Sequence, residues 1–427
     1  MSKRRKSNQS AIINKLSQDL VELVNIFKMG GPANSFTWWN SHSPQSIFTT
    51  YEGYKEGLKI FSEVVQGILK LNPDMLTEKE LDQNLQYEFL AKQVLSQEYL
   101  SQEELTQKAR EYLIELLEPK YQDVDIPVAY LQLDGPPFKL GHVTLMSINQ
   151  RYRESPWRES IFVPDVVRNN IHMIAHVHAP GFKHRAYSYA ISQARLVMYV
   201  LRAFCFPFNP EEADSWQVGI VGDTVFAESI SMIVNKQHEV AQLGLSPIVS
   251  LELRSHLLSK FDSQQWGKID QLLQKCEHSR RPMENKLLDG IHWLAEATMP
   301  DSYQTRFSKI AFALEALVGG ESKNLKTEGI TAMLAERAAF IAGQDLGDRL
   351  DIHENIGKYY GMRSDLVHAR KRKRDISADD IEGFGTLVLR LALALLARLS
   401  DPGNQLNTVD SLASWIKTQR YTLPEQS

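Results

Sequence analysis

The sequence feature that most constrains the fold is a series of helical apolar stripes in the last third of the chain. Between residues 306 and 318, apolar residues recur every three or four positions and so share one face of a helix: Phe307, Ile310, Ala311, Leu314, Leu317 and Val318. Similar patterns predict further helices at 327–342, 345–360, 362–371, 378–399 and 409–418. Successive stripes joined by short loops predict an antiparallel helical bundle that begins at residue 262.

The residues before this bundle divide into two regions. Residues 1–118 are predicted to form a helical region with a basic disordered tail, MSKRRKSNQS. Residues 119–261 contain β-rich segments bounded by Gly and Pro, and a helix at 186–206, so a mixed α/β region is expected. With residues 262–427 as the third part, we expect a multidomain, mainly α-helical protein. Trp38 and Trp39 stand side by side in a loop-like segment, where they can dock a partner or pack against the helices.

Bulk composition limits the classes of function. The chain has 427 residues and a net charge of −4, so attraction to a nucleic acid must come from a local patch. Its two cysteines, Cys205 and Cys276, are too few for a disulfide framework or a cysteine-based zinc site. The sequence shows neither a signal-peptide pattern nor a stretch apolar enough to cross a bilayer. A cytoplasmic protein that does not enter the membrane is therefore predicted.

One segment of the predicted bundle carries residues suited to acid–base chemistry on a phosphate. Arg363 and His368 form an Arg-x4-His motif, which by its spacing alone is a weak signal. On a helix, Tyr360, Ser364 and His368 form a polar line at four-residue spacing, and the long side chain of Arg363 can bend toward it. Imidazole can act as a general acid or base near neutral pH, and guanidinium fits phosphate oxygens.

This segment, with ALEALVGG upstream and GTLVLRLALALLARL downstream, resembles the ApeA-like branch of the HEPN ribonuclease superfamily over residues 265–400. The resemblance implies a helical bundle that cleaves RNA without a metal or other cofactor. It implies that Arg363 and His368 are the catalytic residues, and that two such motifs meet across a homodimer formed through the C-terminal domain. In this chemistry the 2′-hydroxyl attacks the adjacent phosphorus, His368 transfers protons and Arg363 stabilises the phosphate charge.

Other residues near the motif are candidates for assisting roles. Glu315 takes the place of an acidic residue that the superfamily often has on an earlier helix, although an ion pair between helices is an equal alternative. Ser364 and Asp365 follow the arginine where the superfamily frequently has Asn, Asp or His, and Tyr360 precedes it. A basic run after the motif can neutralise RNA phosphates or be a solvated loop: Arg370, Lys371, Arg372, Lys373 and Arg374.

Four histidines of the middle region offer a competing site: His172, His176, His178 and His184. His176 and His178 would share a face of a strand, whereas His172 and His176 would share a face of a helix. Neutral imidazoles gathered in this way can bind zinc, and hydrogen-bonded structural histidines are the alternative. The segment IVGDTVF lacks phosphate-loop spacing and does not support nucleotide binding.

Together these patterns predict a metal-independent endoribonuclease whose partners are RNA and a second copy of the chain. By resemblance it would act in antiviral defence, with residues 1–261 as the sensor of a trigger molecule. Two alternatives stay open. One is a catalytically silent HEPN scaffold that binds RNA or a protein, and the other is a metal-dependent hydrolase built on the histidines of 172–184.

Overall fold

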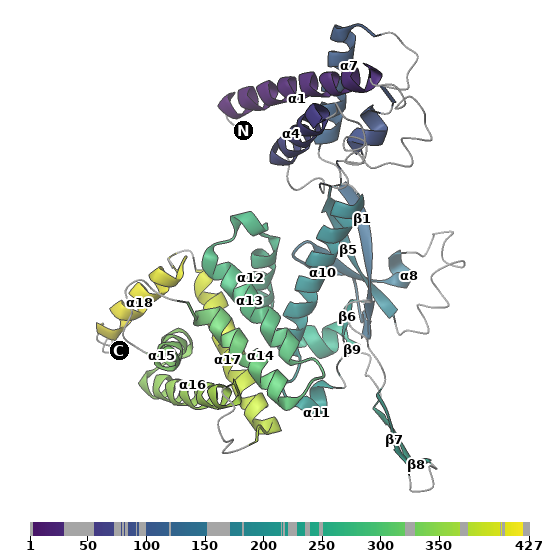
Figure 1. The fold of residues 1–427 in the computed structure, drawn as a ribbon. Coiled ribbons are helices and arrows are strands. Elements are labelled where there is room, and N and C mark those ends of the chain that lie inside the picture. The colour runs from purple at the N-terminus through teal and green to yellow at the C-terminus, as the bar shows by residue number, and fades with distance from the viewer. Residues whose placement is uncertain are drawn as a thin grey trace. The chain divides into compact units, whose positions relative to one another are not determined.

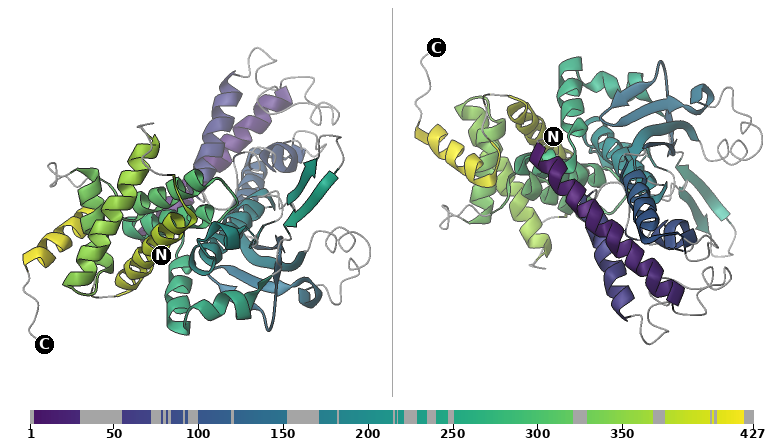
Figure 2. Two further views of the ribbon diagram at one scale, coloured as in Figure 1. Left: turned by 90° about the horizontal axis from the view of Figure 1, so that it is seen from below. Right: turned by 90° about the horizontal axis from the view of Figure 1, so that it is seen from above.

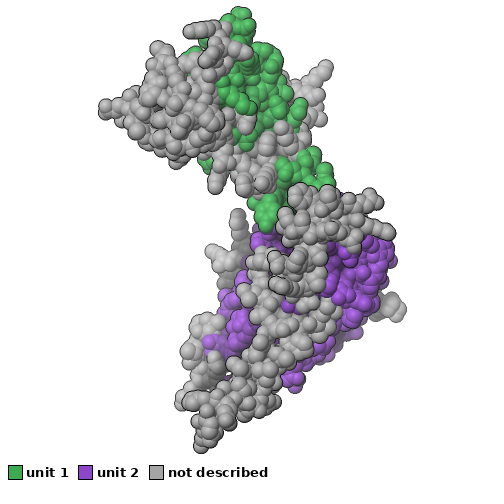
Figure 3. All heavy atoms as spheres, turned by 90° about the vertical axis from the view of Figure 1, so that its right-hand side faces the viewer, with its two compact units in different colours: residues 1–124, 178–190 green, residues 125–177, 191–427 purple. Residues whose placement is uncertain are grey.

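The computed structural model divides the chain into two compact units, which are described separately (Figure 3). The first contains residues 1–124 and 178–190, and the second contains residues 125–177 and 191–427. The structure describes residues 3–29, 55–71, 78, 81, 84–90, 92–93, 100–118, 121–151, 171–181, 183–214, 216, 218–220, 229–234, 240–246, 251–320, 329–367, 375–401, 403 and 406–421. Most of these residues are helical, and a curled antiparallel sheet occupies the middle of the sequence (Figure 1). The predicted domain boundaries at 118 and 261 stay a prediction.

The first unit is mainly helical. Its principal helices are α1 (Lys3–Met29), α4 (Lys55–Leu71), η2 (Asn84–Leu90) and α7 (Gln102–Leu117). α1 packs against α4 and α7, and their apolar stripes bury a common core that includes Leu20, Val64 and Leu113. α7 begins with a capping box, in which Ser101 and Glu104 satisfy each other's backbone N–H groups. Trp38 and Trp39 lie outside the described residues.

The start of α1 differs from the sequence-based expectation. Residues 3–10 belong to the helix, although a disordered tail is predicted for this basic segment. Lys, Arg, Gln and Ser do not oppose helix formation strongly, and extending an existing helix requires no new nucleation. The buried residues from Leu16 onward supply the helix that this segment extends.

The middle of the chain forms a five-stranded sheet with the order β3-β4-β5-β1-β6. Its strands are β1 (Tyr121–Ala129), β3 (Phe138–Leu140), β4 (Val143–Ser147), β5 (Ile171–Pro180) and β6 (Gly219–Ile220). β4 pairs antiparallel with β3 and β5, with Leu145 opposite Ala175, and β1 pairs antiparallel with β6. Leu145 and Val177 are fully buried, because alternate residues of each strand form one apolar face. α10 (Lys183–Cys205) lies against the sheet (Figure 1 and Figure 2).

Smaller elements complete this region, which has the mixed α and β character that its sequence predicts. β2 (Leu131–Gln132) pairs in parallel with β9 (Leu251–Glu252), and β7 (Ser229–Val234) pairs antiparallel with β8 (Val240–Ser246). The short helices are α8 (Ile148–Arg151), α11 (Pro210–Ala213), η4 (Leu253–Leu257) and η5 (Leu258–Lys260).

The last third of the chain is helical, as its apolar stripes predict. Its helices are α12 (Ser263–Gln274), η6 (Glu277–Ser279), α13 (Pro282–Ala297), α14 (Tyr303–Val318), α15 (Ile330–Ala342), α16 (Leu346–Val367), α17 (Ala378–Leu399) and α18 (Val409–Tyr421). α13 packs on α14, α15 packs on α16, and α17 contacts all four of these helices. The buried stripe of α17, which includes Phe384 and Leu391, therefore lies at the centre of the bundle. None of the described helices is long and apolar enough to span a membrane.

One boundary inside this bundle was predicted wrongly. Separate helices are expected at 345–360 and 362–371, but residues 346–367 form the single helix α16. Gly361 does not interrupt it, because both of its sides are anchored: Ile352, Ile356 and Tyr359 bury one face of the helix before the glycine, and Arg363 after it forms an ion pair with Glu315 of α14. Tertiary packing here outweighs the low helix propensity of glycine.

Candidate functional site

Three of the predicted site residues meet where α14 and α16 pack together. The carboxylate of Glu315 on α14 accepts a hydrogen bond from the Tyr360 hydroxyl, with an O···O distance of 2.8 Å. The same Oε1 atom lies 3.2 Å from Nη2 of Arg363. Glu315, Tyr360 and Arg363 thus form one polar group, which we call the Glu315 cluster.

The local structure of the two helices explains this meeting. Leu314 and Leu317 of α14 are fully buried in the core, which leaves Glu315 half-buried at the edge of the helix contact. Tyr360 and Arg363 are three residues apart on α16 and therefore lie one turn apart on the same side. A single carboxylate on the neighbouring helix can then reach both of them.

Aromatic rings hold the Arg363 guanidinium in place as well. Its Cζ atom lies 5.6 Å from the centroid of the Tyr360 ring and 5.8 Å from that of Phe312. Cation–π attraction at such distances adds to the ion pair with Glu315. The Arg363 side chain as a whole is 20% exposed and its Nε atom is buried, so the guanidinium is held firmly in a half-buried position.

The surroundings of Tyr360 keep its phenol neutral. Burial, followed by the hydrogen bond and the negative charge of Glu315, raises the pKa of Tyr360 from 10.0 to about 12, although Arg363 opposes the shift. At neutral pH the hydroxyl is therefore a hydrogen-bond donor to Glu315. Tyr360 is suited to orienting the carboxylate and unsuited to removing a proton from a substrate.

The structure describes only some of the other predicted residues of the motif. Ser364 and Asp365 continue α16 and are half-buried. His368 and the basic run 370–374 lie outside the described residues. The described part of the motif therefore shows Arg363 with Glu315 and Tyr360. The polar line from Tyr360 through Ser364 to His368 stays a prediction.

The histidines of the middle region lie on a strand and pair with carboxylates. His172, His176 and His178 are separated by even numbers of residues on β5 and therefore share one face of it. Nδ1 of His176 is 2.7 Å from a carboxylate oxygen of Asp125, and Nδ1 of His178 is 2.9 Å from one of Asp123. Arg151 donates from Nε to Asp125 over 3.0 Å.

A metal centre is not assembled from these pairs in the described structure. Among the residues that the structure describes, no three His, Cys, Asp or Glu side chains are grouped closely enough to hold a metal ion. His184 belongs to α10, and its side chain lies outside the described residues. The partners Asp123 and Asp125 were missed from the sequence, although their alternation in β1 was a signal that both face the same side.

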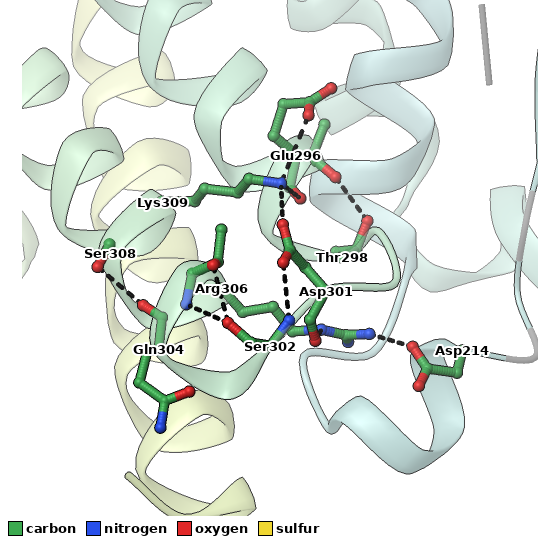
Figure 4. Close-up of polar contacts among 11 residues, drawn as sticks. Asp214, Glu296, Thr298, Asp301, Ser302, Gln304, Arg306, Ser308 and Lys309 are labelled. Carbon is green, nitrogen blue, oxygen red and sulfur yellow. Dashed lines mark hydrogen bonds and ion pairs between the residues drawn. The ribbon is translucent and has the colours of Figure 1, made fainter. Parts of the chain in front are cut away.

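A second polar network, also missed from the sequence, fixes the connection between α13 and α14 (Figure 4). Arg306 is completely buried, pairs with Asp214 beside α11 and donates from Nε to the Asp301 carbonyl oxygen over 3.2 Å. Lys309 donates to a carboxylate oxygen of Asp301 and to the Glu296 carbonyl oxygen, both over 3.2 Å. Burial would raise the pKa of Asp301, but hydrogen bonds from Ser302 and Lys309 lower it below its usual value.

This network is a structural element rather than a catalytic one. Its charges neutralise one another and its donors are directed at backbone carbonyls of the turn. The Glu315 cluster is different, because the Arg363 side chain is 20% exposed, whereas Arg306 is completely buried. Comparisons of the chain with protein-family models, with curated proteins and with solved structures gave no match.

Proposed function

We propose that the protein is a metal-independent endoribonuclease of the HEPN type and that Arg363 is part of its active site. The observation that carries this proposal is the geometry of the Glu315 cluster. A carboxylate at 3.2 Å and two aromatic rings orient the guanidinium of Arg363, whose side chain as a whole is 20% exposed. The ion pair uses Nη2 and the Nε atom is buried, so the two N–H donors of Nη1 remain for a phosphate oxygen.

In the proposed reaction the 2′-hydroxyl of RNA attacks the neighbouring phosphorus. His368 accepts or donates the proton, and the Arg363 guanidinium stabilises the charge that builds up on the phosphate oxygens. The bond to the 5′-oxygen breaks, which leaves a 2′,3′-cyclic phosphate on one product and a 5′-hydroxyl on the other. Glu315 and Tyr360 act by positioning Arg363, and Ser364 and Asp365 are candidate assisting residues.

The wider biological role follows from the resemblance to the ApeA-like branch. We propose a cytoplasmic homodimer in which two motifs come together through the C-terminal domain, with the basic run 370–374 binding RNA phosphates. The preceding residues would sense a trigger molecule during antiviral defence. A catalytically silent RNA-binding scaffold is the second candidate, because the Arg363–Glu315 ion pair would also join α14 to α16 in a purely structural role.

The test is cleavage of a fluorescent RNA in excess EDTA. Arg363→Ala and His368→Ala should each lower the rate by about 10²–10⁴-fold, as is typical for the loss of an acid–base or charge-stabilising group. His353→Ala is the matched control, because His353 is an exposed histidine elsewhere on α16 and should leave the rate unchanged.

Two further outcomes decide between the candidates. A substrate with one deoxynucleotide at the cleavage position should resist, because it lacks the attacking hydroxyl. Cleavage that survives in His368→Ala, or that EDTA abolishes, would refute the mechanism and direct attention to His172, His176 and His178. Binding of RNA by the wild type without any cleavage would support the silent scaffold.

A further inference from the structure

A groove on the C-terminal helical bundle takes no part in the proposed reaction. α15 packs against both α16 and α18, and residues of these three helices line a cavity of about 480 Å³ (Figure 1). The apolar part of its lining comes from α15 and α16: Ala332, Ala339, Phe340, Leu346 and Leu350. We call this cavity the α16 groove. Leu350 precedes Arg363 by about 20 Å along the axis of α16, so the groove is separate from the Glu315 cluster.

The α16 groove carries two leucines that the fold leaves exposed. Leu346 is 72% exposed and Leu350 is 62% exposed. They are four residues apart and therefore lie one turn apart on the same side of α16. Ile352 and Ile356 bury the other side of this helix in the bundle. Exposed apolar side chains that adjoin one another beside a cavity are typical of a surface that another protein covers.

The charged residues of the groove indicate which partner fits. Arg349 is half-buried with its guanidinium 5.0 Å from the centroid of the Phe340 ring, and it forms no ion pair with a described carboxylate. Burial, followed by the positive charge of Arg349, lowers the pKa of Arg398, so positive charge is concentrated here. Glu336 also lines the groove, but its carboxylate is paired with Arg420. The groove therefore combines an apolar surface with a cation that lacks an anionic partner.

We propose that the α16 groove binds an amphipathic helix of a partner protein, with apolar side chains of that helix in the cavity and a carboxylate on Arg349. An apolar groove between helices is a common receptor for such a helix, which places anchors at three- and four-residue spacing. The exposed leucines fit a protein better than a nucleic acid, whose backbone is charged. Asp351 and Glu354 of α16 are exposed but do not line the groove, so they do not oppose an acidic partner within it.

A fluorescent synthetic peptide tests the groove on the full-length protein. The probe is a short helical peptide with leucines at four-residue spacing on one side and glutamates beside them. It should bind saturably, and Leu346→Ala and Leu350→Ala should each weaken its binding about tenfold, the loss expected for an apolar anchor. Both leucines are exposed, so their truncation should leave the fold intact. Ile114→Ala is the matched control, because Ile114 is an exposed apolar residue of α7.

The charge requirement is tested with a second peptide, in which glutamines replace the glutamates. Arg349→Gln should weaken binding of the glutamate peptide by about threefold, as is typical for a partly exposed ion pair, and should not affect the glutamine peptide. Added salt should likewise weaken only the binding of the glutamate peptide. Lys358→Gln is the control, because Lys358 is an exposed cation about two and a half turns after Arg349 and therefore on the opposite side of α16.

Four results would overturn the inference. The first is that the glutamate peptide does not bind saturably, or binds wild type and Leu350→Ala equally. The second is self-association of the protein that Leu350→Ala abolishes, because a second copy would then occupy the groove. The third is competitive displacement of the peptide by RNA, which would assign the groove to a nucleic acid. The fourth is loss of RNA cleavage in Leu350→Ala, which would place the groove in the reaction. Leucine-dependent peptide binding supports the inference whether or not the protein cleaves RNA.

Discussion

Glu315 is the residue that joins the parts of the candidate site, because one of its carboxylate oxygens contacts both Tyr360 and Arg363. Glu315→Gln removes the negative charge, so the pKa of Tyr360 should fall from about 12 toward its ordinary value of 10.0. Burial will still hold it above that value. The change can be followed by the ultraviolet absorbance of the phenolate during a pH titration, with Tyr360→Phe identifying the contribution of this tyrosine.

The same shift predicts the sign of a stability change at high pH. Between pH 10.0 and about 12 the unfolded chain releases the Tyr360 proton and the folded chain keeps it. The free energy of unfolding should therefore fall through this range, and less steeply in Glu315→Gln. Glu354→Gln is the matched control, because Glu354 is an exposed carboxylate on α16. Equal titration curves for wild type and Glu315→Gln would show that the cluster does not control Tyr360.

At the residue scale, the sequence identified the site in part. Tyr360 and Arg363 are three positions apart, so their proximity follows from helical spacing alone. The contact with Glu315 joins residues on different helices. The family resemblance and the alternative of an ion pair between helices both pointed to Glu315, but neither named its partners. The ring contact between Trp293 and Phe312 was missed for the same reason, because the two residues belong to different helices and become neighbours only when α13 packs on α14.

At the scale of elements, a glycine on α16 provides a test of how this helix is packed. A Cβ atom added at Gly357 would meet nothing within 4 Å, so this glycine faces open space in the described structure. Gly357→Ala should raise the free energy of unfolding by about 0.5–1 kcal/mol, because alanine loses less conformational entropy in a helix. Thermal or denaturant unfolding measures the change.

Gly385 on α17 is the matched control for this substitution. A Cβ atom there would lie 2.3 Å from Cγ of Phe208, so Gly385→Ala should destabilise the protein. Equal effects of the two substitutions would mean that Gly357 does not face open space.

The positions of strands in the sequence were easier to predict than the way in which the strands pair. β-Rich segments bounded by Gly and Pro located β1 and β4 in the sequence, because that pattern is local. The pairing of β2 with β9 joins Leu131 to Leu251, and no local pattern specifies a partner so far along the chain. The sequence therefore predicted a mixed region but not the order β3-β4-β5-β1-β6.

At the scale of the whole molecule, the proposed mechanism requires two copies of the chain. One histidine cannot readily act as both base and acid in the same step, so a site built from two His368 side chains should form only in a homodimer. Light scattering should then give twice the mass of the chain.

Mixing wild-type and variant subunits tests whether both copies contribute to one active site. After subunits of wild type and His368→Ala exchange in equal amounts, about one quarter of the dimers contain two wild-type chains. If both histidines are needed, RNA cleavage should fall to about one quarter of that of an all-wild-type sample, whereas independent sites would retain about one half. His353→Ala mixed in the same way should cause no loss. A monomer that cleaves RNA, or a mixture that retains half of the activity, would show that each chain carries a complete site.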